Sequence, residues 1–162
     1  MSFDTRQLRN AFGQFATGVC VATATGADGQ PFGMTINSFS SVSLSPALVL
    51  WSVQNDSTQT AEWLAASHYG ISVLAEDQQG ISNFFATPGD RHVPAEHLHT
   101  GSDGVPLIAN AKAQFECRVV DRIPAGDHTI LIGEVSAMAT PRPEAAPLLF
   151  FAGQYRDIAA QS

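Results

Sequence analysis

The clearest sign of the fold is the sequence VCVATATGADGQPFGMTI at residues 19–36. Residues 19–25 are rich in β-branched side chains, which favour strands, and the turn formers at 26–29 interrupt them. A second β-rich run follows at residues 31–36. Two strand-like runs separated by a short turn rich in glycine and aspartate predict an antiparallel hairpin.

Short helical patterns flank this hairpin. Asp4 with Gln7 forms a capping-box pattern, and Leu8, Phe12 and Phe15 then recur at helical spacing, so we expect an N-terminal helix that ends at Gly18. Ser57 is the expected cap of a second helix around residues 60–64. A third helix is expected over residues 77–86.

Strand-like runs dominate the rest of the chain, at residues 47–53, 69–74, 111–121, 129–139 and 147–151. The runs at 111–121 and 129–139 meet around residues 124–127. Residues 87–103 contain prolines, glycines and three histidines without periodicity, which predicts a long surface loop. Hairpin-connected strands with few helices predict a mainly β, antiparallel small barrel.

Length and composition limit the function classes. The 162 residues are enough for a single domain spanning 1–162, and 44% of them are apolar. The net charge is −7, and the seven arginines are scattered, with Lys112 the one lysine, so no nucleic acid is expected as a partner. Neither a signal peptide nor a membrane-spanning run is seen, which predicts a cytoplasmic protein. Cys20 and Cys117 are expected to be reduced core residues.

Several common catalytic motifs do not occur in the sequence. No two glycines are spaced as G-x-G, so the dinucleotide-binding fingerprint is excluded, and G-x-S-x-G, C-x-x-C and H-E-x-x-H do not occur either. His92, His97 and His99 are irregularly spaced and have no obvious fourth ligand. We therefore expect no metal site.

Three segments carry polar groups suited to binding a ligand. Residues 33–43 crowd hydroxyls and an amide at a strand end, where they could bind a heteroaromatic ring or a phosphate, although an ordinary polar turn has the same composition. Residues 55–58 stand at an expected helix start, which favours an anion or simply a helix cap. The third segment is residues 126–128, where Asp127 can orient His128, and Tyr155 follows Gly153 later in the chain. The alternative is that His128 is an ordinary surface histidine.

These segments together resemble a known family. Residues 9–19 (RNAFGQFATGV), 33–46 (GMTINSFSSVSLSP), 126–128 (GDH), 133–135 (GEV) and 147–155 (PLLFFAGQY) resemble the flavin reductase-like family, in order and along nearly the whole chain. Members are reductase components of two-component flavin-dependent monooxygenases. The resemblance implies a flavin-binding split barrel of Greek-key topology that forms a homodimer with flavin near the subunit interface.

The resemblance also implies an activity and a site. NAD(P)H would reduce FMN or FAD, and the reduced flavin would diffuse to a separate monooxygenase acting on an aromatic or related substrate. The scarcity of basic residues favours NADH over NADPH. His128 and Tyr155 would line the nicotinamide side, and Phe85 and Arg91 would border the site. The residues expected to contact the flavin are Thr35, Asn37, Ser38, Ser40, Ser41, Ser52 and Ser57.

Two other interpretations remain open at this point. The chain could be a split-barrel module that binds flavin or haem without turnover, which a steady-state NADH oxidation assay with added flavin would separate from a reductase. The serine-rich segment could instead be only a dimer contact, in which case titration would show no quenching of flavin fluorescence.

Overall fold

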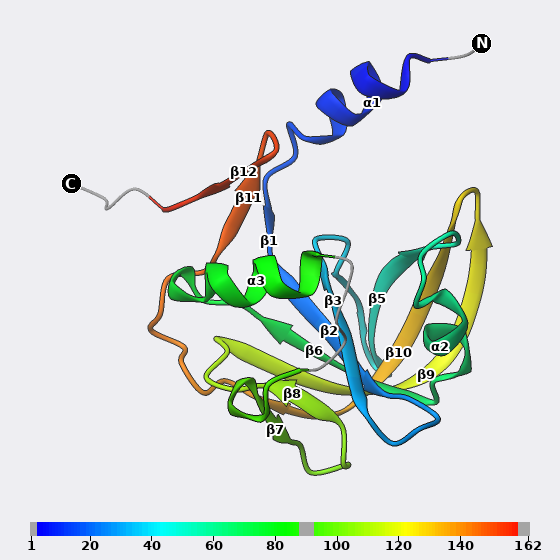
Figure 1. Ribbon diagram of the computed structural model, residues 1–162, viewed down its shortest axis with the longest axis vertical. Coiled ribbons are helices and arrows are strands. Elements are labelled where there is room, and N and C mark those ends of the chain that lie inside the picture. The colour runs from blue at the N-terminus through cyan, green and yellow to red at the C-terminus, as the bar shows by residue number, and fades with distance from the viewer. Residues whose placement is uncertain (1–2, 88–92, 159–162) are drawn as a thin grey trace.

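The computed structural model describes residues 3–87 and 93–158, and its main unit is a curled seven-stranded antiparallel sheet (Figure 1). The expected hairpin forms its first edge. In spatial order the strands are β3 (Pro31–Ile36), β2 (Cys20–Thr25), β6 (His68–Val73), β9 (Ala113–Ala125), β10 (His128–Ala139), β5 (Ala47–Gln54) and β4 (Ser40–Leu44).

The two edge strands, β3 and β4, are neighbours in sequence, and residues 37–39 alone connect them. The ring of Phe39 stacks on Phe115 of β9, with ring centroids 5.8 Å apart, and so packs this connection against the core. The sheet is therefore a barrel that is split between β3 and β4. The chain passes from β5 at one side of the β9–β10 hairpin to β6 at the other, so the order of strands in space is not their order in sequence.

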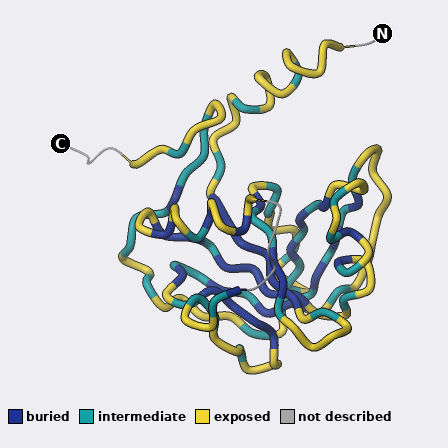
Figure 2. Tube along the Cα trace, in the orientation of Figure 1, coloured by how far each residue is buried: buried dark blue, intermediate teal, exposed yellow. Residues whose placement is uncertain are grey.

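Aromatic side chains fill the interior of the barrel. Trp51 of β5 packs edge-on against Trp63 of α2 (Thr60–Ala65) and against Tyr69 of β6, at centroid distances of 4.8 and 5.8 Å. Figure 2 shows the central strands as the most buried part of the chain. Cys20 and Cys117 are free and buried, and burial raises the pKa of each thiol to about 12, which leaves both unreactive. The prediction that both are reduced core residues is confirmed.

Gly133 on β10 makes room for this aromatic core. A Cβ added there would fall against the Tyr69 hydroxyl and lie 2.9 Å from Cβ of Cys117. We expect Gly133→Ala to lower the free energy of unfolding by about 1–3 kcal/mol, the usual cost of overpacking. Urea denaturation measures this change.

The matched control is Gly80→Ala in α3 (Gln79–Ala86), where an added Cβ meets nothing within 4 Å. Alanine is the better helix former by roughly 0.5–1 kcal/mol, so this variant should be stabilised. Equal stability of the two variants would contradict the close packing at Gly133.

A small second sheet stands apart from the barrel and carries the N-terminal helix (Figure 1). It contains β1 (Thr17–Gly18), β11 (Leu149–Phe151) and β12 (Gln154–Arg156). The helix α1 (Thr5–Phe12) begins as predicted, because the Asp4 carboxylate accepts hydrogen bonds from the Arg6 and Gln7 amides. It ends at Phe12, with Gly13 as its C-cap, and not at Gly18, which lies in β1 and pairs with Leu149. Pairing with a distant strand thus shortens the helix.

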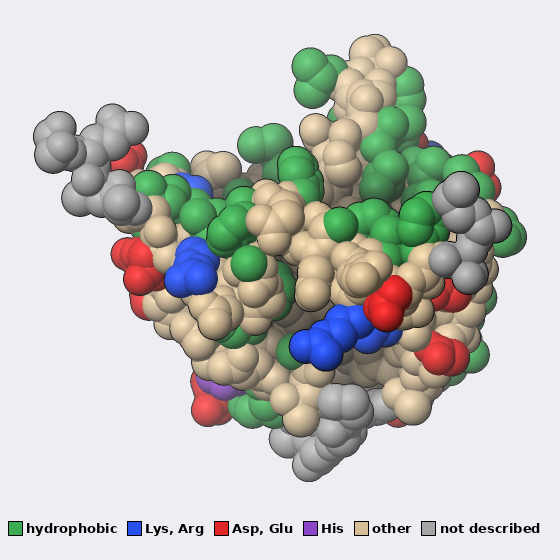
Figure 3. All heavy atoms as spheres, turned by 90° about the horizontal axis from the view of Figure 1, so that it is seen from above, with side chains coloured by type: hydrophobic (Ala, Val, Ile, Leu, Met, Phe, Trp, Pro, Cys, Tyr) green, Lys and Arg blue, Asp and Glu red, His purple; other side chains and the backbone are tan. Residues whose placement is uncertain are grey.

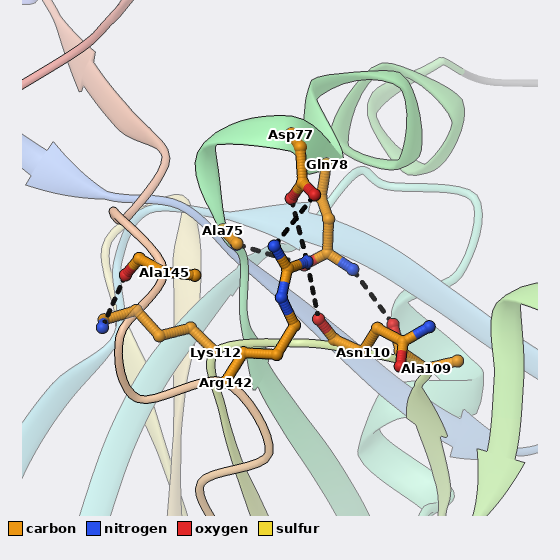
Figure 4. Close-up of polar contacts among 8 residues, drawn as sticks. All are labelled: Ala75, Asp77, Gln78, Ala109, Asn110, Lys112, Arg142 and Ala145. Carbon is orange, nitrogen blue, oxygen red and sulfur yellow. Dashed lines mark hydrogen bonds and ion pairs between the residues drawn. The ribbon is translucent and has the colours of Figure 1, made fainter.

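The predicted third helix is confirmed as a short 3-10 turn, η1 (Glu76–Gln78), followed by α3. Figure 4 shows the polar contacts that hold this region. Arg142 donates two hydrogen bonds to the Asp77 carboxylate, at 2.9 and 3.0 Å, and these bonds hold the pKa of Asp77 below its usual value. Gln78 accepts from the Ala75 amide and donates to the Ala109 carbonyl. The Arg142 contacts join the start of α3 to the segment that leads from β10 to β11, and the Gln78 contact joins it to the segment that leads from β8 (Pro106–Ile108) to β9.

Three sequence predictions need correction. The loop predicted for residues 87–103 contains η2 (Ala95–His97) and β7 (Leu98–Thr100), and β7 pairs with β8 (Pro106–Ile108). The buried Glu116 carboxylate accepts hydrogen bonds from the backbone amides of Ser102 and Asp103 and so orders the turn between β7 and β8. Ser57 does not cap α2, which begins three residues later. Residues 40–44 form the strand β4 rather than a turn, because they pair with β5.

Candidate functional site

The outer face of the β5–β10 ladder gathers several of the predicted site residues. Side chains at 49, 51 and 53 of β5 point into the barrel, so Ser52 and Gln54 point outward, as does His128 of β10, which is the register partner of Gln54. Ile130 lies opposite Ser52 on the same face. Polar and apolar groups therefore alternate over one continuous surface.

The connection between β3 and β4 contacts β5 at Ser52. The Ser38 hydroxyl accepts a hydrogen bond from the Ser52 amide at 3.1 Å and lies 3.4 Å from the Ser52 carbonyl, so the two predicted residues are in direct contact. Asn37, at the bend that precedes Ser38, is exposed. Asn37 is thus one residue away from this contact.

Ser40 and Ser41 continue along β4, opposite Leu50 and Val49 of β5. Both are exposed, and the Ser40 hydroxyl donates to the Ser41 carbonyl at 3.1 Å. Ser41 adjoins an irregularity in the pairing of β4 with β5. These two hydroxyls therefore belong to the open edge of the barrel.

The GDH segment forms the tight turn between β9 and β10. Gly126 has φ of +66°, a conformation that suits glycine, and Ala125 pairs with His128 across the turn. Nδ1 of His128 lies 2.7 Å from the Asp127 carboxylate, and this hydrogen bond holds the pKa of Asp127 below its ordinary value. An ionised carboxylate only accepts, so Nδ1 carries the proton. In this tautomer Nε2 is the acceptor of the ring.

Ser57 lies in the turn that follows β5. Its amide donates to the Gln54 carbonyl at 3.1 Å, and its hydroxyl is 3.4 Å from the Gln59 amide. Because Gln54 is also the partner of His128, the structure brings the second and third polar segments of the sequence to one end of the ladder. The helix that follows has only six residues, so little of an anion's stabilisation would come from its dipole.

Thr35 and Tyr155 meet at α3, on the other side of the split. The Thr35 hydroxyl donates to the Ser82 carbonyl at 2.6 Å, and the Tyr155 hydroxyl lies 2.7 Å from the Ser82 hydroxyl. Tyr155 also donates to the Asn83 side chain at 3.0 Å. Sequence reasoning missed Ser82, which is fully buried in the third helix, and its place in an apolar helix was the available signal.

The two remaining predicted site residues differ in their placement. Phe85 is 8% exposed and packs between α3 and the barrel, close to Gly33 of β3, the strand that also carries Thr35. Arg91 lies outside the described residues, as does His92. Within the described residues no three His, Cys, Asp or Glu side chains are grouped as a metal ion needs.

The donor set fits a flavin. A flavin ring needs hydrogen-bond donors along its carbonyl edge and an apolar surface for its faces, and its phosphate needs amide and hydroxyl donors. Ser52 supplies a hydroxyl next to Leu50, Ile130 and Ile132, which are partly buried on the outer face of the ladder, and Asn37 adjoins Ser38, which contacts Ser52. The arrangement offers positioning and hydrogen bonding.

Known proteins similar to this chain are flavin reductases. The profile described as "Flavin reductase like domain" matches residues 12–159. The chain is 47% identical over 135 residues to a probable flavin reductase of Rhizobium meliloti, covering 83% of this chain and 43% of that protein. It is 43% identical over 152 residues to the FMN reductase (NADH) SmoA of Agrobacterium fabrum, covering 94% of this chain and 85% of that protein. The chain thus spans less than half of the first relative and most of the second.

Solved structures agree with the fold. The Streptomyces globisporus NADH:FAD oxidoreductase SgcE6, in complex with NAD and FAD fragments, superposes with a TM-score of 0.91 at 39% identity, covering 98% of this chain and 95% of that one. The flavin reductase PheA2 superposes with a TM-score of 0.88 at 40% identity, covering 97% and 99%. The mainly β split barrel expected from the sequence is confirmed, and the chain belongs to the flavin reductase-like domain family.

Proposed function

We propose that this protein is an NADH-dependent flavin reductase that supplies reduced FMN or FAD to a separate monooxygenase. The observation that carries the proposal is that Ser52, whose amide donates to the Ser38 hydroxyl, lies on the same face of the β5–β10 ladder as His128. The names of several relatives describe this activity and support the proposal. One is the reductase component of a flavin-dependent trigonelline monooxygenase from Acinetobacter baylyi, to which the chain is 45% identical over 130 residues.

Each side chain would act by position. Asn37, Ser38, Ser52 and Thr35 would bind the flavin ring and its chain, with Ser40, Ser41 and Ser57 nearer its edge and phosphate. When bound, the flavin and the nicotinamide would supply the hydride-transfer chemistry. The protein gains rate by holding the two rings in contact and excluding water between them. His128 and Tyr155 would line the nicotinamide, with Phe85 and Arg91 at the border.

NADH is the proposed donor because the chain offers few cations for a 2′-phosphate. The end of the molecule seen in Figure 3 carries few basic side chains among broad polar and apolar areas. Several relatives are named NADH-dependent, including the reductase StyB of Pseudomonas fluorescens, 38% identical over 157 residues.

Steady-state oxidation of NADH and NADPH, with FMN, FAD and riboflavin in turn, tests the proposal. Multiple turnovers with NADH and either nucleotide flavin are expected. The rival interpretation, a module that binds flavin or haem without turnover, predicts ligand binding but no oxidation of either nucleotide. A higher catalytic efficiency with NADPH would overturn the choice of donor.

We also propose that the active form is a homodimer. The face of α1 and the loop after it expose Phe12 and Phe15 at 68% and 79%, and the edge strand β4 exposes Leu44 at 96%. An unpaired edge strand and exposed aromatic side chains need cover, and a second copy of the chain would supply it for both. The apolar areas at this end of the molecule are visible in Figure 3.

A charge at the exposed apolar positions tests the dimer. We expect Leu44→Glu and Phe15→Glu to convert the dimer to monomer, because an ionised carboxylate would have to be buried in the interface. Light scattering after size exclusion gives the mass of each variant. A monomeric wild-type protein at tens of micromolar would refute the dimer.

A cytoplasmic location and a single functional domain over residues 1–162 complete the proposal. Among residues 3–87 and 93–158, no helix combines the length and the apolar character that crossing a membrane requires. The two buried thiols are reduced, as is usual in the cytoplasm. Fractionation of cells that make the protein would test the location.

A further inference from the structure

Asn55, the first residue after β5, makes two contacts with the GDH turn and a third with Thr129, the residue that follows it. Its amide donates to the Asp127 carbonyl at 2.9 Å, and its side-chain Nδ2 donates to the Gly126 carbonyl at 3.3 Å. The Thr129 hydroxyl donates to Oδ1 of Asn55 at 2.8 Å. One side chain thus holds residues on both sides of His128.

The Asp127–His128 pair alone cannot hold the imidazole in place. Side-chain exposure is 86% for Asp127 and 41% for His128, and ion pairs between such exposed groups contribute little. The turn itself needs Gly126 in a left-handed conformation, which leaves its carbonyl free for an outside donor. The orientation of His128 therefore depends on the hydrogen bonds that hold the backbone of the turn.

Thr129, whose side chain is buried, also holds Asn55 through a hydrogen bond. It is 7% exposed, so its hydroxyl needs a partner within the protein, and Oδ1 of Asn55 is that partner. On the other side of Asn55, the Gln54 carbonyl accepts hydrogen bonds from the Ser57 amide and from the Thr60 hydroxyl, at 3.1 and 2.7 Å. Asn55 consequently stands between the turn of Ser57 and the turn of His128.

We propose that Asn55 is a positioning residue that fixes the GDH turn and so directs His128 toward the nicotinamide. This inference rests on the proposed function. Asn55 touches neither cofactor in this account, and it acts through the backbone on either side of His128. Loss of its side chain should therefore affect the reaction with NADH much more than the binding of flavin.

The experiment compares Asn55→Ala and Thr129→Val with the conservative Thr129→Ser, which keeps the hydroxyl. Stopped-flow reduction of bound flavin by NADH should slow about tenfold in the first two variants, since a misplacement of about 1 Å can cost on the order of a hundredfold. The KM for NADH should rise, while the flavin dissociation constant should stay within about twofold. Thr129→Ser should react like the wild type.

A double-mutant cycle with His128→Ala decides whether Asn55 acts through that histidine. Asn55→Ala should cause no further slowing when His128 is already alanine. The same slowing in both backgrounds would show a general structural effect and overturn the inference. If Asn55→Ala does not fold, Thr129→Val carries the same cycle.

Failure of this inference is distinguishable from failure of the proposed function. If His128→Ala is slow while Asn55→Ala and Thr129→Val react at the wild-type rate, the role of Asn55 is wrong and the reductase stands. If His128→Ala itself reacts at the wild-type rate, Asn55 has no histidine to position and the inference is wrong. If the wild type oxidises no NADH, the proposed function fails first.

Discussion

His128→Ala should reduce bound flavin with NADH roughly ten- to a hundredfold more slowly than the wild type, with little change in flavin affinity. The reason is the place of the ring on the outer face of the ladder, beside the residues proposed to hold the flavin, with Nδ1 bonded to Asp127 and Nε2 left as an acceptor. Removing the ring leaves the nicotinamide less well oriented. Stopped-flow absorbance of the flavin measures the rate directly.

The control for this prediction is His68→Ala. His68 is an exposed histidine of β6 that lies 3.0 Å from the Ser67 hydroxyl, so it matches His128 in chemistry but stands outside the site. It should reduce flavin at the wild-type rate. A wild-type rate in His128→Ala as well would make His128 an ordinary surface residue.

The second large effect is expected on flavin binding. Ser57→Ala should weaken flavin binding about ten- to a hundredfold, because the loss of one hydrogen bond to the charged phosphate costs about 1.5–3 kcal/mol. Asn37→Ala should weaken it about two- to tenfold, because a hydrogen bond to the uncharged ring contributes about 0.5–1.5 kcal/mol. Asn37 is exposed beside Ser38, and Ser57 is partly buried in the turn after β5. Calorimetric titration with FMN and with FAD measures both constants.

Ser67→Ala is the matched control for the flavin titrations. Ser67 is exposed, and the side-chain contact described for it is with the neighbouring His68. In the sequence, α2 lies between Ser57 and Ser67. It should bind flavin like the wild type. Unchanged dissociation constants in both Asn37→Ala and Ser57→Ala would remove these residues from the proposed site.

Local patterns in the sequence predict much of the fold. The hairpin of residues 19–36 and the helix over 77–86 appear as expected, because β-branched runs, turn formers and helical spacing act over a few residues. The end of the first helix was missed because it depends on the pairing of β1 with β11, far along the chain. The strand at 40–44 pairs with the neighbouring β5, but its three serines do not give a strand-like pattern. The short strand β7, whose partner begins six residues after it ends, lies among prolines and glycines that predict a loop.

The candidate site shows the same division. The polar segments at 33–43, 55–58 and 126–128 stand out in the sequence, but their convergence on one ladder follows only from the pairing of β5 with β10. Ser82 and Asn55 act through contacts with residues more than 70 positions away, Tyr155 and Thr129 respectively. Such contacts have no local signature, so composition and spacing could not reveal them.

The protein should use flavin as a diffusing substrate, and the amount of flavin reduced per protein tests this. Purified protein is mixed with NADH and a large excess of free FMN or FAD under anaerobic conditions, and the flavin reduced per protein is counted by absorbance. The whole flavin pool should be reduced, because a reductase that supplies flavin to a separate monooxygenase must release its product. Reduction that stops at one equivalent per protein would contradict it and indicate a flavoprotein that keeps its cofactor.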